Sequence, residues 1–195
     1  HPATVLASAF LVAIVLGTSL LMLPLATASG QSAPLLTALF TATSAVCVTG
    51  LVVVDTGTYW SGTGQFIVMA LFQLGGFGMM TSATLMVLLM GGQMKLRTRL
   101  LLQTETHALS LGDVRSVARV VLVVTVLCEA VVGIWLAVRF SKTLGVGWSE
   151  ALWHGVFHSV SAFSNAGFST WPDSVMRHAT DVWVLAPLML AIVVG

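Results

Sequence analysis

The feature that most constrains this chain is a series of long apolar stretches that carry almost no charge. Residues 5–23 contain no charged side chain, and at about 1.5 Å per helical residue they can cross a hydrocarbon layer about 30 Å thick. Residues 62–90 are also uncharged, and residues 117–138 carry only Arg119 near their start and Glu129 at mid-length. The sequence therefore predicts an all-α, polytopic membrane protein.

Composition agrees with a lipid surrounding. Hydrophobic residues make up 57% of the 195 residues and charged residues only 8%, whereas soluble domains average about 25% charged residues. The formal net charge of +1 is too small to attract a polyanion, which excludes nucleic acid as a partner. Cys47 and Cys128 lie far apart inside apolar runs and form neither a disulfide framework nor a CxxC metal or redox motif.

Basic residues indicate how the chain crosses the membrane. Five of the eight basic residues lie in or beside the segment between the second and third spans: Lys95, Arg97, Arg99, Arg115 and Arg119. The positive-inside rule places this segment in the cytoplasm. We expect residues 95–119 to be a short amphipathic segment that contacts anionic lipid or docks a regulatory partner. The segment between the first and second spans and the segment after the third span then lie outside.

Residues 33–48 are apolar or small, yet too few to cross the membrane and return as two helices. Residues 35–44 are predicted to form a helix about half a membrane long, with Pro34 at a position that suits a helix start. The chain must then leave as extended backbone. Such backbone is tolerated at membrane depth only inside protein or along a watery cavity, so residues 46–50 are predicted to line a pore.

An internal repeat supports this interpretation. A shift of 117 positions superposes Phe40, Ser44, Ala45 and Gly50 on Phe157, Ser161, Ala162 and Gly167. The repeated unit is a span, a re-entrant helix, an extended loop and a second span. We assign residues 1–91 to the first unit, 92–116 to a cytoplasmic linker and 117–195 to the second unit. The last span, residues 182–195, is too short to cross the membrane, so we expect the natural chain to continue.

The repeated loops suit ion selection. Consecutive backbone carbonyls can replace the hydration shell of an ion, and glycine permits the backbone geometry that turns them inward. About four such loops encircle a potassium ion in channels, and the re-entrant helix ends, each carrying about half a negative charge, favour a cation. Because two loops form half a ring, we expect that residues 1–195 alone do not conduct ions.

Four strings in order resemble the Trk/Ktr/HKT superfamily of potassium-transporting membrane subunits: LGTSLLMLP, TATSAVCVTGLVVVDTG, FQLGGFGMM and FHSVSAFSNAGFS. The resemblance covers both repeats and implies the first two of the four units that build the pore subunit of this superfamily. By position, it implies two selectivity-filter segments whose backbone carbonyls bind potassium. These residues are Cys47, Val48, Thr49 and Gly50 in the first loop, and Ser164, Asn165, Ala166 and Gly167 in the second.

The resemblance also sets the functional expectation. It implies potassium uptake through the inner (plasma) membrane of a prokaryote by a multi-pass protein that is not an enzyme and uses no cofactor. Glycine at both filter centres goes with potassium selectivity in the superfamily, whereas a first-loop serine is associated with sodium transport in some plant members. The expected partners are the lipid bilayer, the remaining two pore repeats or a second copy of the chain, and a ring of cytoplasmic nucleotide-binding regulatory subunits.

One alternative belongs to another functional class. Glu150, His154 and His158 follow one another at intervals of four residues, which would place them on one helix face and could form a metal site in a membrane metal-binding protein or metalloenzyme. The string HGVFH lacks the general base of the HExxH zinc-protease motif. The other interpretation is that both histidines pack or form hydrogen bonds behind the filter.

Several other residues have two interpretations. Glu129 at mid-membrane is costly unless partnered, and we expect a structural partner near the pore loop rather than an ion-binding role. Glycines at 75, 76 and 78 permit close packing rather than a helix bend. The acidic side chains in the outer loops either concentrate cations at the pore mouth or only solvate these loops: Asp55, Asp173 and Asp181.

Overall fold

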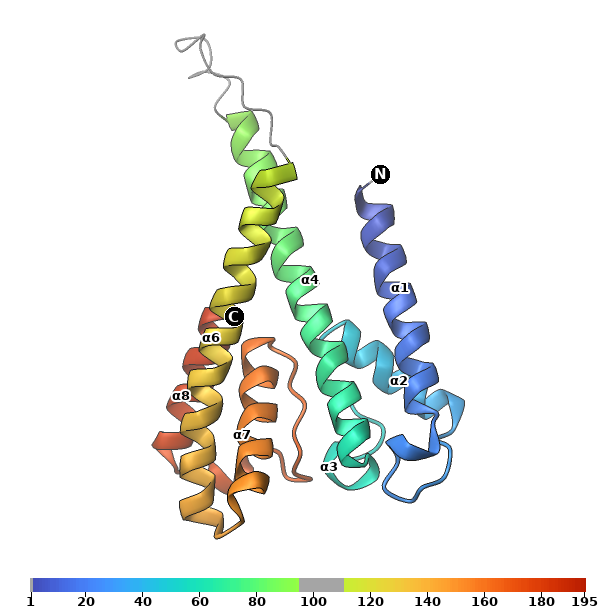
Figure 1. Cartoon of the computed structure of the whole chain (residues 1–195), viewed down its shortest axis with the longest axis vertical. Coiled ribbons are helices and arrows are strands. Elements are labelled where there is room, and N and C mark those ends of the chain that lie inside the picture. The colour runs from blue at the N-terminus through green and yellow to red at the C-terminus, as the bar shows by residue number, and fades with distance from the viewer. Residues whose placement is uncertain (1, 95–110) are drawn as a thin grey trace.

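The computed structural model describes residues 2–94 and 111–195, and these residues fold into helices without a β-strand (Figure 1). The long and short helices alternate in the predicted order. In chain order they are α1 (Pro2–Leu21), η1 (Pro24–Ala26), α2 (Leu35–Val46), α3 (Thr56–Tyr59), α4 (Gly62–Met94), α6 (Leu111–Leu144), α7 (Trp148–Phe163), η2 (Met176–His178) and α8 (Val182–Val194). The all-α expectation is confirmed.

Short helices are present at both positions predicted to be re-entrant, and each is too short to cross a membrane. The first, α2, has 12 residues and α7 has 16, which correspond to about 18 and 24 Å of helix. In Figure 1, α2 lies beside α1 and α4, whereas α7 lies beside α6 and α8. Each of these two helices therefore packs against the helices of its own half of the chain.

The third long helix, α6, extends past both predicted ends. It runs from Leu111 to Leu144 instead of covering residues 117–138, so Arg139 and Lys142 lie within the helix. The helix stops before Gly145, which has a φ of +65° and supplies the left-handed turn that commonly ends a helix. Hydropathy predicts the apolar part of a helix but does not predict where its backbone hydrogen bonds end.

Three basic residues of the predicted linker lie outside the described residues: Lys95, Arg97 and Arg99.

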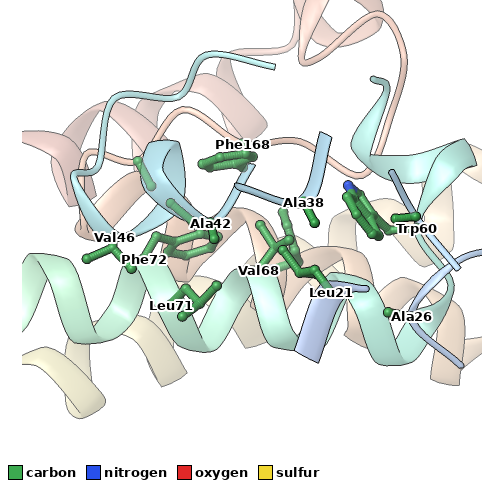
Figure 2. Packing of buried hydrophobic residues seen from close by; sticks show 14 of the residues in the cluster. Leu21, Ala26, Ala38, Ala42, Val46, Trp60, Val68, Leu71, Phe72 and Phe168 are labelled. Atoms are coloured by element: carbon green, nitrogen blue, oxygen red, sulfur yellow. The ribbon is translucent and has the colours of Figure 1, made fainter. Parts of the chain in front are cut away.

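The main core joins the two repeats around Phe72 of α4. Its ring stacks on Phe168 with centroids 5.7 Å apart and meets Phe157 edge-on, also at 5.7 Å. Figure 2 shows the Phe72 and Phe168 rings together with small residues of α2, Ala38 and Ala42, which are fully buried. Aromatic pairs in these geometries add to the free energy of apolar burial. The second span of one repeat thus packs against the pore helix and loop of the next.

Apolar side chains also cover the outside of the molecule. Leu11 and Val15 on α1, and Val123 and Leu127 on α6, are each more than half exposed. Among the described residues, Gly62–Met80 and Ala118–Leu144 are long and apolar enough to cross a membrane. Exposed apolar faces of this extent are unfavourable in water, and they fit a protein whose long helices lie in lipid.

The helices α6 and α7 approach each other most closely at two glycines. A methyl group at Gly155 would lie 2.5 Å from the carbonyl oxygen of Gly133 and 2.7 Å from the backbone nitrogen of Ala137. Both of these atoms belong to the α6 backbone, which cannot move aside without bending the helix. The contact between these two helices therefore requires glycine at position 155.

We predict that Gly155→Ala in the natural full-length protein lowers the free energy of unfolding in detergent by about 1–3 kcal/mol, the range for an overpacked interior. The matched control is Gly62→Ala, because no atom lies within 4 Å of a methyl group built there. Thermal unfolding of both variants tests the prediction. Equal stability of the two variants would show that α6 and α7 do not meet at this glycine.

Candidate functional site

The two loops predicted as filters begin with the same hydrogen-bond pattern. The N–H of Cys47 donates to the carbonyl of Thr43 over 2.9 Å, and that of Ser164 donates to Val160 over 3.0 Å. Two residues later, the N–H of Thr49 returns to Ser44 and the N–H of Ala166 returns to Ser161, at 2.9 and 2.7 Å. Donors and acceptors are both related by the shift of 117 positions, so the repeat extends to the backbone of the loops.

Left-handed backbone also recurs at equivalent positions. Val48 and Asn165 have φ angles of 54° and 55°, and Gly50 and Gly167 have 70° and 73°. A positive φ is uncommon for residues other than glycine and rare for a β-branched one, so its recurrence at Val48 is a specific property of the loop. A positive φ at alternate residues is therefore common to both loops.

The two loops lie against each other at their glycines. A methyl group built at Gly50 would lie 2.5 Å from the carbonyl oxygen of Ala166 and 3.3 Å from the Cα of Gly167. One built at Gly167 would lie 3.6 Å from the Cα of Gly50. The second loop can therefore approach the first only because position 50 lacks a side chain. Residues that are 117 positions apart in sequence form one local surface of backbone.

Equivalent serines on α2 and α7 hold the chain that follows each helix. The Ser44 hydroxyl lies 3.0 Å from Oγ1 of Thr49, and the Ser161 hydroxyl donates to the carbonyl of Phe168 over 2.7 Å. Both serines are buried. A buried hydroxyl is costly unless it forms such a bond. The serines thereby fix where each loop leaves its helix.

The helix α4 packs against both loops through small residues. A methyl group at Gly75 would overlap the carbonyl oxygen of Val46, and one at Gly76 would lie 3.0 Å from Cβ of Ser164. The predicted packing role of these glycines is confirmed, and their contacts are the ends of the two pore helices. Gly78 is less critical, because a methyl group there would meet only the Phe10 ring at 3.4 Å.

Gln73 contacts the second loop, and this role was not predicted from the sequence. Its Oε1 accepts a hydrogen bond from the Ser164 hydroxyl, and its Nε2 donates to the Glu129 carboxylate. Glu129 therefore has a structural partner close to a pore loop. The amide of Gln73 in the middle of an otherwise apolar span could have indicated a buried hydrogen bond. The sequence does not show which residue this amide faces.

Of the three residues considered as a metal site, His154 and His158 form hydrogen bonds with other residues, and Glu150 lies 3.8 Å from Nε2 of His154. The described residues contain no group of three or more metal-ligand side chains. His158 Nδ1 lies 2.8 Å from the carbonyl of His154, which can only accept, so Nδ1 carries the proton. Its Nε2 then accepts from the Ser169 hydroxyl at 3.0 Å. His154 Nδ1 bonds Thr170 over 2.7 Å, and both histidines thus hold the chain after the second filter segment.

The three outer carboxylates also have structural partners. Asp55 accepts from the N–H of Thr58 at 2.8 Å and caps the short helix α3. The other two form ion pairs, Asp173 with Arg177 at 2.6 Å and Asp181 with Arg139 at 2.9 Å. Hydrogen bonds from these guanidinium groups hold the pKa of both aspartates below the ordinary value of 3.8. These contacts favour a role in loop structure over concentration of cations.

Known proteins resemble this chain along its whole length. Residues 1–195 match the TrkH family, described as a cation transport protein. Potassium uptake protein B of the Ktr system of Bacillus subtilis is 39% identical over 194 residues. The potassium/sodium uptake protein NtpJ of Enterococcus hirae is 34% identical over 194 residues, and potassium uptake protein B of the Ktr system of Vibrio alginolyticus is 36% identical over 162 residues.

These alignments confirm the family resemblance seen in the sequence. They cover 100% of this chain and 43% of the Bacillus and Enterococcus proteins, and 83% of this chain and 35% of the Vibrio protein. The chain therefore spans less than half the length of the curated relatives that it matches.

The ion pair between Arg139 and Asp181 leads to a prediction about acid. Because the folded state lowers the pKa of Asp181 below 3.8, the pair stabilises the fold above that pH and ceases to do so as the pH falls through the lowered pKa. Asp181→Asn should lower the melting temperature at pH 7 by about 1–3 °C. The difference from the parent protein should shrink below pH 3.8. A difference that grows in acid would contradict this assignment.

Proposed function

Because this chain belongs to the TrkH family of cation transport proteins, we propose that it forms part of a pathway for potassium uptake across the cell membrane. Two relatives are named for potassium uptake alone, and one for potassium and sodium. The observation that carries the proposal is the pair of matching loops after α2 and α7, which meet at Gly50 and Gly167.

In this proposal, the ion is bound by backbone carbonyls of the two loops. The first set is Cys47 to Gly50 and the second is Ser164 to Gly167. Carbonyl oxygens replace the water that the ion loses, and no charged side chain is needed. The C-terminal ends of α2 and α7 both lead into these loops, and their partial negative charge favours a cation over an anion.

Two loops supply only part of a coordination shell. The remaining carbonyls would come from the rest of the natural full-length protein, or from a second copy of the chain, since the family has four repeats around its pathway. The basic residues between the second and third spans support a multi-pass arrangement in which α2 and α7 enter from the outer side and the linker of residues 92–116 lies in the cytoplasm. A regulatory nucleotide-binding ring would dock on that cytoplasmic side.

The filter proposal is tested by Gly50→Ser in the natural full-length protein, expressed in a bacterium that lacks its own potassium uptake. A side chain at this position would clash with the carbonyl of Ala166 and displace one binding surface from the other. We predict that the ratio of potassium to sodium uptake falls about tenfold, which corresponds to about 1.4 kcal/mol of discrimination.

The matched control is Gly30→Ser. Gly30 has nearly the same backbone angle, with a φ of +69°, but a side chain there meets no atom within 4 Å. Both variants therefore introduce similar backbone strain, and only Gly50→Ser alters the junction of the loops. An unchanged ion ratio in Gly50→Ser, with the protein present in the membrane, would refute the assignment of Gly50 to the filter.

A further inference from the structure

The side chain of the first residue in the second filter segment forms a hydrogen bond to α4 and is connected through it to α6. The hydroxyl of Ser164, the first residue of that segment, donates to Oε1 of Gln73 on α4 over 3.0 Å. Nε2 of the same amide donates to Oε2 of Glu129 on α6 over 2.9 Å. Ser164 is buried, with 5% of its surface exposed. A single amide thus connects the start of the filter segment to a carboxylate on another helix.

Glu129 is fixed by its backbone as well as by its side chain. Its carbonyl oxygen accepts a hydrogen bond from the Ser159 hydroxyl of α7 over 2.8 Å. The bonds therefore form a closed circuit through three helices, from α7 to α6, on to α4 and back to the end of α7. Closed networks of buried hydrogen bonds restrict the positions of their members more than isolated bonds do.

One turn of α4 touches both filter loops. Gln73 and Gly76 contact Ser164 at the start of the second loop, and Gly75 packs on the carbonyl of Val46 at the start of the first. The position of this turn therefore sets the distance between the two loops. Gln73 accepts a hydrogen bond from Ser164, whereas Gly75 and Gly76 make packing contacts with the two loops.

We propose that Gln73 is a positioning residue for ion selectivity: held by Glu129, it fixes the second filter segment relative to the first through Ser164. This inference rests on the proposed filter. Under the shift of 117 positions, Ser164 corresponds to Cys47, whose thiol is only a weak donor, and Glu129 corresponds to Val12, whose side chain has no acceptor. The circuit therefore serves the junction between repeats and has no copy within the first one.

The role of Glu129 in this proposal is to accept a hydrogen bond. Its Oε2 accepts from Gln73, whereas Oε1 is buried without a hydrogen-bond partner. Among the ion pairs of the described residues, none includes Glu129. A second glutamine on α4, Gln65, offers a comparison. It accepts from Trp153 of α7 over 2.8 Å and donates to the carbonyl of Gly57, but it makes no hydrogen bond to residues 47–50 or 164–167.

The experiment compares ion selectivity in variants of the natural full-length protein. Gln73→Leu removes both hydrogen bonds at nearly constant volume, and the matched control Gln65→Leu removes the bonds that lie away from the filter. We expect Gln73→Leu to lower the ratio of potassium to sodium uptake about fivefold, equivalent to about 1 kcal/mol for one hydrogen bond. Gln65→Leu should reduce protein abundance or stability without changing that ratio.

A reciprocal exchange gives the sharper test. In Gln73→Glu alone, the donor to Glu129 is lost and two carboxyl groups face each other, so the ion ratio should fall. In the double variant Gln73→Glu/Glu129→Gln, the amide at position 129 can donate to the carboxylate at position 73, which still accepts from Ser164. Both bonds are then restored, and the ratio should return to within about twofold of the parent. A merely structural contribution to folding would change abundance and leave the ratio constant in every variant.

The outcomes separate this inference from the filter proposal. If Gly50→Ser changes the ion ratio but Gln73→Leu and Gln73→Glu leave it unchanged, the positioning role of Gln73 is wrong and the filter stands. If none of the three changes the ratio, the filter proposal itself fails. If Gln73→Leu does not reach the membrane, Gln73→Glu and the double variant decide the question, and failure of the double variant to recover selectivity overturns the inference.

Discussion

The structure depends on one constraint, which is that backbone amides away from water must find hydrogen-bond partners. The chain after α2 and after α7 leaves the helix without becoming a strand, so its N–H groups turn back to the last carbonyls of the helix that they follow. This return explains why each loop stays close to the end of its short helix. In the proposed function, the carbonyls of these loops then bind the ion.

The second physical requirement is close approach of backbone to backbone. Gly50 meets the loop around Ala166, and Gly75 meets the end of α2, at distances that no side chain permits. Such contacts fix the spacing of the loops with little freedom to adjust. The hydrogen bonds through Gln73 add a directional element that packing alone lacks. Selectivity in this account is a property of loop spacing, which is held by one turn of α4.

The sequence predicts the local parts of this arrangement well and the long-range parts poorly. The shift of 117 positions located both loops, because each loop carries its own helix end and glycine. Apolar length located the long helices but missed the ends of α6, where Gly145 and not hydropathy stops the helix. The partners of Glu129 and His158 could not be predicted, because a periodic pattern shows which residues share a face and not which side chain lies opposite. Whether residues 47–50 and 164–167 bind an ion stays a prediction.

The central claim is that the backbone of the two loops binds the transported cation, and ion density tests it most directly. The natural full-length protein, crystallised with rubidium or thallium in place of potassium, should show anomalous density beside the loop carbonyls near Gly50 and Gly167. The density should disappear when sodium is the only cation. Density confined to side-chain carboxylates such as Glu129, with none beside the loop carbonyls, would contradict the account.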